Sequence, residues 1–188
     1  MTNEYIYFTS SLPALSFAGE PPTSVEYFLI DCQSQLSGGD YDLVRHILAG
    51  NYDIVGDCCE TVRELLEFTQ GFQNDLAHYR AERAHKDPSN YTRGARTGNQ
   101  RYMEIITQAG KMANLLEAEQ LIDRMKWENW ESIAANSFFQ VENVIVYGLQ
   151  LQMLEKYQAI RSFKGTEIFK EITDPAFIEQ YLYKTNKE

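Results

Sequence analysis

The sequence lacks a long hydrophobic run that could cross a membrane. Its most apolar uncharged stretch, NVIVYGLQLQML, covers residues 143–154, whereas a membrane-spanning helix needs about 20 such residues. The first residues, MTNEYIYFTSSLPALSF, have no positively charged start and place Glu4 before a broken apolar run, so they do not form a signal peptide. These absences lead us to expect a cytoplasmic protein without a membrane span.

Positive charge and cysteine are both scarce. The chain has 17 Lys and Arg against 27 Asp and Glu, a formal net charge of -10. Such a chain repels nucleic acid and anionic membrane surfaces unless its cations are clustered. The three cysteines are Cys32, Cys58 and Cys59, with no C-x-x-C pair. This odd number excludes a disulfide framework and is typical of a reducing compartment.

Motifs for nucleotide binding and for hydrolysis are missing. The chain contains neither G-x-G-x-x-G nor a P-loop, and it has no G-x-S-x-G nucleophile motif. Cys58 and Cys59 follow a predicted helix cap, Asp57, and a helix start favours the thiolate. The carboxylates of Asp57 and Glu60 oppose it, so we interpret these cysteines as structural, with a reactive Cys58 as the alternative.

Hydrophobic residues recur at the three- and four-residue spacings of helices. Thr23 with Glu26 resembles a capping box, and Asp40 and Asp57 are further predicted caps. Gly71 is expected to weaken the helix that contains it. The predicted helices cover 25–36, 40–50, 60–85, about 102–116 and a long segment from Trp127 or Trp130 to about Ile160, with short helices after Gly165.

The pattern predicts an all-α protein: a single-domain bundle of long antiparallel helices with a short extended N-terminal arm. One helical domain would cover 1–188, with an arm and loop at 1–22, helical parts at 23–86 and 98–185, and a flexible loop at 87–97. Residues 143–154 are apolar on more than one side, which predicts a central core helix. One face of that helix meeting another protein chain is the alternative, and both interpretations can hold together.

His78, Glu82 and His85 share one face of the predicted helix 60–85 and carry side chains that ligate zinc or iron. The two histidines are seven residues apart, about 10 Å along a helix, which is too far for one ion. We therefore favour a solvated, charged helix face and expect no metal site.

Basic residues cluster between His78 and Arg101. This segment has six positive and two negative side chains, which leaves a net charge of -14 on the rest of the chain. Two interpretations stay open, an ordinary solvated hairpin tip and a surface that docks on an acidic partner, for which arginine is well suited. Reversing Arg93 and Arg96 to Glu would then weaken assembly and leave folding intact. The six candidate interface residues are Arg80, Arg83, Lys86, Arg93, Arg96 and Arg101.

Two stretches carry a family resemblance. YIYFTSSLPALSF with PPTSVEYFLIDCQSQLSGGDYDLVRHI resembles the opening of a bacterial family of uncharacterised proteins encoded among the subunits of V-type (A/V-type) ATPases. NVIVYGLQLQMLEKYQAIRSFKGTEIFKEI resembles the closing helices of the AC39 family of V-type ATPase subunits. Well-studied members of that family are longer and contain three similar helical domains, so this chain departs from them in size.

The resemblance implies a non-catalytic, all-helical subunit that couples the central stalk to the proteolipid rotor ring during ion transport. It implies no catalytic residue, cofactor or metal, and a cytoplasmic location peripheral to the membrane through partner subunits. Two alternatives stay open: a small helical enzyme or metal-binding protein that uses His78, Glu82 and His85, and a helical adaptor unrelated to ATPases.

Overall fold

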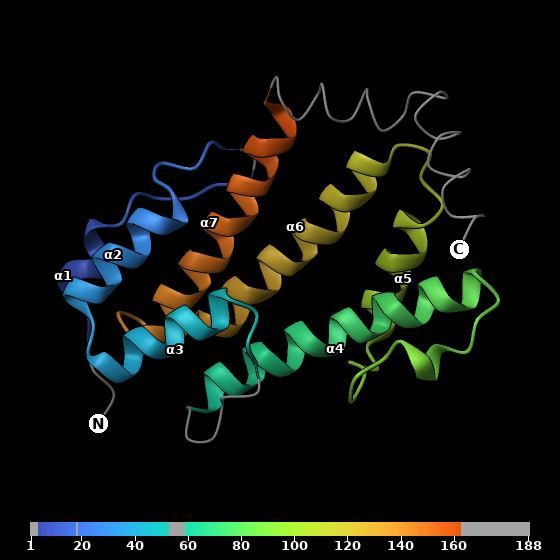
Figure 1. The fold of residues 1–188 in the computed structure, drawn as a ribbon, viewed down its shortest axis with the longest axis horizontal. Coiled ribbons are helices and arrows are strands. Elements are labelled where there is room, and N and C mark those ends of the chain that lie inside the picture. The colour runs from blue at the N-terminus through green and yellow to red at the C-terminus, as the bar shows by residue number, and fades with distance from the viewer. Residues whose placement is uncertain (1–3, 18, 53–58, 163–188) are drawn as a thin grey trace, which may run out of the picture.

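All regular secondary structure among the described residues is helical, which confirms the predicted all-α class (Figure 1). The computed structural model describes residues 4–17, 19–52 and 59–162. No helix in these ranges is both long and apolar enough to cross a membrane. The elements are α1 (Ile6–Ser11), α2 (Val25–Gln35), α3 (Gly38–Leu48), α4 (Glu60–Arg83), the 3-10 turn η1 (Pro88–Asn90), α5 (Gln100–Ala109), α6 (Leu115–Ala134) and α7 (Val141–Arg161).

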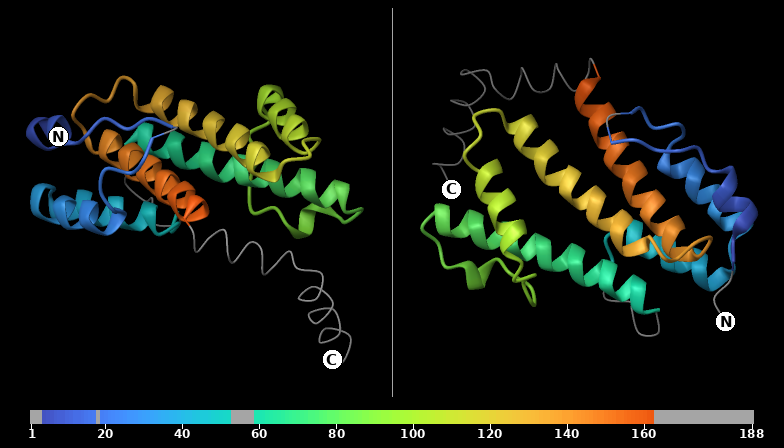
Figure 2. Two further views of the ribbon diagram at one scale, coloured as in Figure 1. Left: turned by 90° about the horizontal axis from the view of Figure 1, so that it is seen from above. Right: turned by 180° about the vertical axis from the view of Figure 1, so that it is seen from behind.

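Helix α7 lies at the centre of the bundle. Helices α2 and α3 pack on one side of it and α6 packs on the other, as the two further views also show (Figure 2). Helices α4 and α5 contact α6 and each other; α4 runs from below α3 to the end of the molecule where α5 lies. The buried hydrophobic residues of all these helices belong to one cluster.

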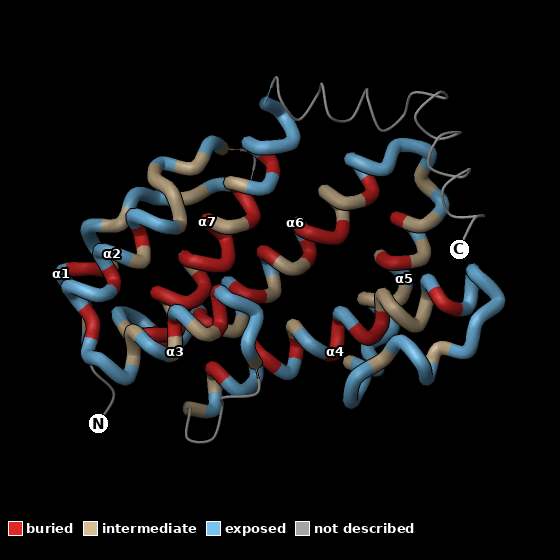
Figure 3. Tube along the Cα trace, viewed as in Figure 1, coloured by how far each residue is buried: buried red, intermediate tan, exposed pale blue. Residues whose placement is uncertain are grey.

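The uncharged stretch 143–154 is the core helix that its composition predicts. None of its residues is exposed, and Val144, Ile145 and Leu151 are completely buried (Figure 3). A helix that is apolar nearly all round must be covered on nearly all sides. Within this chain the covering comes from α2, α3 and α6, so the stretch leaves no exposed face for another protein chain.

The N-terminal segment differs from the extended arm that its aromatic and β-branched residues predict. Residues 6–11 form α1, and Phe8 from this short helix is buried and stacks on Phe28 of α2. The backbone N–H of Tyr5 donates to the carbonyl oxygen of Phe139 at 2.6 Å. Tertiary packing therefore selects a helical turn at a place where local propensity favours a strand.

The helix caps lie one to three residues away from the predicted positions. Ser24, and not Thr23, caps α2, because its hydroxyl accepts from the Tyr27 N–H. Ser37, and not Asp40, caps α3 and accepts from the Asp40 N–H. Serine fits this position because its short side chain reaches back to the free N–H groups of the first turn. The predicted cap Asp57 lies outside the described residues, and α4 begins after Cys59.

Two predicted helices are interrupted. The segment expected to be helical over 102–116 ends at Ala109, and Asn114 caps a new helix by accepting from the N–H groups of Leu116 and Glu117. The long element expected from Trp127 to Ile160 breaks between α6 and α7. Phe139 lies in the left-handed region there, with φ of 61°, so the α-helix cannot continue through it.

We predict that Gly148→Ala lowers the free energy of unfolding by about 1–3 kcal/mol, the usual cost of overpacking a core. A methyl group at this position would lie 2.8 Å from Leu48 Cδ1 and 2.9 Å from Phe28 Cε1, both in buried side chains. Urea unfolding would measure the change. Gly39→Ala is the matched control, because nothing lies within 4 Å of its added carbon. Equal stability of the two variants would contradict this packing account.

Candidate partner-binding surface

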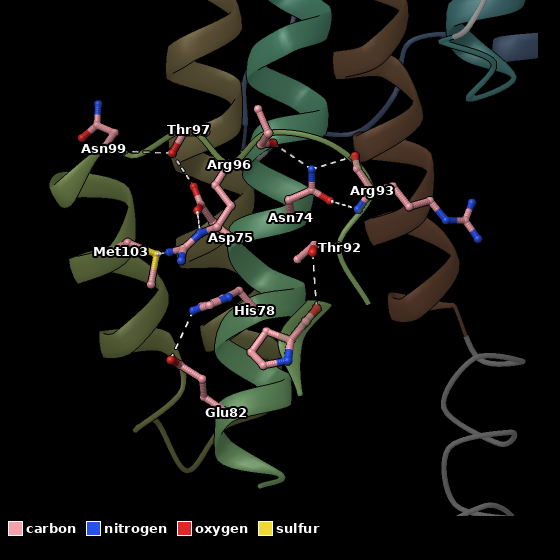
Figure 4. A network of polar contacts seen from close by, with 12 residues as sticks. Asn74, Asp75, His78, Glu82, Thr92, Arg93, Arg96, Thr97, Asn99 and Met103 are labelled. Atoms are coloured by element: carbon pink, nitrogen blue, oxygen red, sulfur yellow. Dashed lines mark hydrogen bonds and ion pairs between the residues drawn. The ribbon is translucent and has the colours of Figure 1, made fainter. Parts of the chain in front are cut away.

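The basic segment begins on α4, where two polar residues are buried among apolar ones. Asn74 is 4% exposed and Asp75 is 0% exposed. The Asn74 amide nitrogen donates to the carbonyl oxygens of Arg93 at 2.9 Å and Ala95 at 2.8 Å. Its oxygen accepts from the Arg93 N–H at 2.8 Å (Figure 4). One side chain thus holds the backbone of a loop about 20 residues away in sequence.

Asp75 fastens the next residues of the same loop. Its carboxylate accepts from Arg96 Nε at 2.7 Å and from the Thr97 hydroxyl. Gly71, one turn earlier, lets the loop approach α4 closely, since an added Cβ would lie 3.2 Å from the Thr97 nitrogen. We call Asn74, Asp75 and their partners in residues 93–97 the loop clasp.

The loop clasp corrects two expectations. Residues 93–97 belong to the segment predicted to be a flexible loop, yet five hydrogen bonds with Asn74 and Asp75 hold them on α4. Helix propensity predicts only that Gly71 weakens its helix. In the structure, the missing side chain of this glycine also lets the Thr97 backbone lie close to α4. The spacing Gly71-x-x-Asn74-Asp75 places these residues on one helix face, and this was the available sequence signal.

The six predicted interface residues lie on the second half of α4, on the segment that follows it and at the start of α5. They differ in how many contacts each charged group already makes. Arg96 pairs with buried Asp75. Arg83 donates to the Gly110 carbonyl, Lys86 lies over the Tyr91 ring, and Arg80 is 3.9 Å from Glu119. Arg93 and Arg101 are exposed and have no ion pair within the described residues; the Arg93 side chain points away from the loop clasp (Figure 4).

A groove that sequence reasoning missed lies beside these cations, between α4, α5 and the start of α6. Its volume is about 600 Å³, and Arg80 and Arg83 line it together with Tyr79 and Ile106. Leu115, another lining residue, is 77% exposed. The groove combines an apolar lining with two arginines. The hydrophobic periodicity of a single helix could not predict this groove, because residues of three separate helices line it.

The candidate metal ligands do not form a cluster. His78 Nε2 lies 3.2 Å from Glu82 Oε1, and this exposed carboxylate is its partner (Figure 4). His85 follows the end of α4 in the left-handed conformation, with φ of 55°. Within the described ranges, no three His, Cys, Asp or Glu side chains are arranged to hold a metal ion.

The two adjacent cysteines fall at the start of α4. Cys58 lies outside the described residues. Cys59 precedes the first residue of α4, and its thiol donates to Glu142 Oε1 of α7 at 2.7 Å. Cys32 is fully buried in α2, and burial raises the pKa of its thiol to about 12. A buried, protonated thiol is chemically inert, so Cys32 has a structural role as part of the hydrophobic core.

A second buried carboxylate, Asp123 of α6, organises the polar contacts between α6 and α7. It accepts from Lys126 Nζ at 3.1 Å, from Lys156 Nζ at 2.5 Å and from the Tyr157 hydroxyl at 2.9 Å. Burial opposes its ionisation, but the two lysines and the tyrosine hydroxyl outweigh it, so the pKa of Asp123 is lowered. Lys156 also contacts Glu119 at 3.2 Å, which links the cluster toward Arg80.

We predict that Asn74→Ala lowers the free energy of unfolding by about 1–3 kcal/mol, because three hydrogen bonds of a buried side chain are lost. Cleavage between residues 93 and 97 in limited proteolysis should also become faster. Gln70→Ala is the matched control, because this exposed residue gives the same loop one bond, to the Arg93 carbonyl. Equal losses for both variants would show that the buried position of Asn74 does not matter.

The lowered pKa of Asp123 predicts a specific acid sensitivity. A carboxylate with a depressed folded-state pKa stabilises the protein above its unfolded value, here 3.8, and loses that contribution as the pH falls through the folded value. Asp123→Asn should therefore be less stable than the wild type at neutral pH, and the difference should shrink below about pH 4. Urea unfolding across pH 2–7 measures it. A difference that is independent of pH would contradict the assignment.

The comparisons with known proteins give a family and no activity. No curated protein and no solved structure matches the chain. A family described as "Protein of unknown function (DUF2764)" matches residues 48–178, which include α4 to α7 and therefore the loop clasp, the basic cluster and the Asp123 contacts. The chain belongs to the DUF2764 family.

Proposed function

We propose that the protein is a non-catalytic subunit of a V-type ATP synthase or ATPase, similar to the AC39 family, which couples the central stalk to the membrane rotor ring. In this proposal its basic end, formed by the last turns of α4, residues 93–97 and the start of α5, docks on an acidic surface of a partner protein. The protein would be cytoplasmic and reach the membrane only through such partners.

The observation that supports docking most directly is that Arg93 has a fixed backbone and an exposed, unpaired side chain within the described residues. Its backbone is held by Asn74 through two hydrogen bonds, while its side chain points away from the loop clasp and has no ion pair within the described residues. A loop that is already ordered loses little conformational entropy when it binds. An arginine guanidinium then offers a planar set of donors that fits a carboxylate.

The groove beside the cations extends this surface. Arg80 and Arg83 line an apolar cleft, and exposed Leu115 lines it as well. An amphipathic helix that carries acidic residues beside its apolar face would match both features. The partner class, central stalk and proteolipid ring subunits, comes from the resemblance of the N-terminal stretch and of residues 143–172 to V-type ATPase proteins.

The first test is affinity capture of the tagged protein from gently solubilised native membranes, with retained proteins identified by mass spectrometry. We expect V-type catalytic, stalk and proteolipid subunits to be recovered together. Recovery of the protein without any of them, from membranes shown to contain the complex, would overturn the proposal.

A charge-reversal variant then tests the surface itself. Arg93→Glu with Arg101→Glu should reduce recovery of the partner subunits about tenfold or more, because each change replaces attraction to an acidic surface by repulsion. Thermal unfolding should stay close to that of the wild type, since neither side chain has an ion pair within the described part of the chain. Arg96 is left unchanged because reversing it would place a second carboxylate against buried Asp75.

The matched control reverses two exposed arginines away from this surface, Arg45 on α3 and Arg63 at the start of α4. It changes the net charge by the same amount. Equal loss of partners in both double variants would mean that overall charge, and not the basic end, governs assembly.

A further inference from the structure

A cavity separate from the basic end lies where α4, α6 and α7 meet. Its volume is about 240 Å³. Its polar side includes Lys126, Lys156 and buried Asp123, and its apolar side includes Phe68, Trp130 and Met153. None of the six proposed interface cations lines it.

Lys126 and Lys156 are both bound by Asp123, and each keeps N–H donors that make no hydrogen bond to the protein within the described residues. Asp123 is only 2% exposed and binds both ammonium groups, one on each carboxylate oxygen. An ammonium group has three N–H donors. Lys126 uses one of them, on Asp123, and Lys156 uses two, on Asp123 and Glu119. The pair therefore retains three donors. Its positive charges are opposed by Asp123 on the cavity wall and by Glu119, which contacts Lys156 at 3.2 Å but does not line the cavity.

The apolar side of the cavity includes buried aromatic side chains that pack against their neighbours. Phe68 is 9% exposed and stacks on Phe72, and Trp130 is 6% exposed with its indole N–H on the Thr69 hydroxyl at 3.3 Å. An apolar cavity of about 150 Å³ accepts a benzene molecule. A volume of about 240 Å³ thus holds one aromatic ring or a branched aliphatic chain together with a polar head group.

We propose that this cavity binds a small monocarboxylate with an apolar or aromatic body. The ligand's carboxylate would accept hydrogen bonds from Lys126 and Lys156, which Asp123 holds in position. Its body would lie against Phe68, Trp130 and Met153. A carboxylate would accept charge-assisted hydrogen bonds from the spare ammonium donors, and these are stronger than the bonds that a neutral ligand accepts.

The proposal does not depend on the partner surface. It uses no arginine of the basic end and would stand if the chain had no V-type ATPase partner.

The test uses benzoate as the probe and benzyl alcohol as its uncharged counterpart. Titration calorimetry on the full chain should give benzoate a dissociation constant of about 0.1–1 mM and benzyl alcohol at least about tenfold weaker binding. Two-dimensional NMR should show benzoate shifting the Trp130 indole N–H signal, while that of Trp127, which does not line the cavity, stays unchanged. Trp127→Phe assigns the two signals.

Variants of Lys126 separate charge recognition from structure. Lys126→Met should weaken benzoate binding about tenfold or more, and Lys126→Arg should largely retain it, because guanidinium also binds carboxylates. Lys111→Met, which changes an exposed lysine outside the cavity, is the control. Lys156 and Tyr157 still hold Asp123 in the Lys126 variants, and thermal unfolding verifies their fold.

Three results would overturn the proposal. One is the absence of benzoate binding up to about 10 mM, a concentration at which even weak specific sites fill. Another is equal affinity for benzoate and benzyl alcohol. This comparison uses the wild type alone, so it does not depend on the folding of any variant. The third is a benzoate effect on both tryptophan signals with unchanged affinity in Lys126→Met, which would indicate non-specific binding.

Discussion

The burial of α7 is the constraint on which the rest of the structure depends. Its central residues are apolar on almost every side, so water must be excluded all around the helix and not only along one stripe. Helices α2 and α3 cover one side and α6 covers the other. This arrangement sets the order of the bundle, because the segments before and after α4 must both return to the same central helix.

Three carboxylates, those of Asp75, Asp123 and Glu142, are buried in the bundle, and each has different hydrogen-bond partners. Asp123 is surrounded by two lysines and a tyrosine hydroxyl, and Asp75 is paired with Arg96 and Thr97. Glu142 accepts from the Cys59 thiol through one oxygen, while the other has no hydrogen-bond partner within the described residues. For Asp123 and Asp75, cations and hydroxyl groups offset the cost of burying the charge.

The sequence predicted the class of the fold, the position of α4 and the end of α7 well, because three- and four-residue spacing reports directly which residues face a core. It missed the break at 110–114, since Met112 and Leu116 continue the apolar spacing of α5 across the gap. Phe138, in the segment predicted to belong to the long helix, is 69% exposed because the chain turns at Phe139. The clustering of basic residues was visible from composition, but the buried partner of Arg96 was not, since Asp75 is 21 residues away.

The loop clasp has a mechanical consequence. Its hydrogen bonds join neighbouring residues of α4 to neighbouring residues of one loop, and a load applied to Arg93 is shared among several of them instead of falling on one. Force entering at the loop passes directly into a helix of 24 residues that runs along the body of the molecule. A push or a pull on Arg93 would therefore reach α4 without first stretching slack chain.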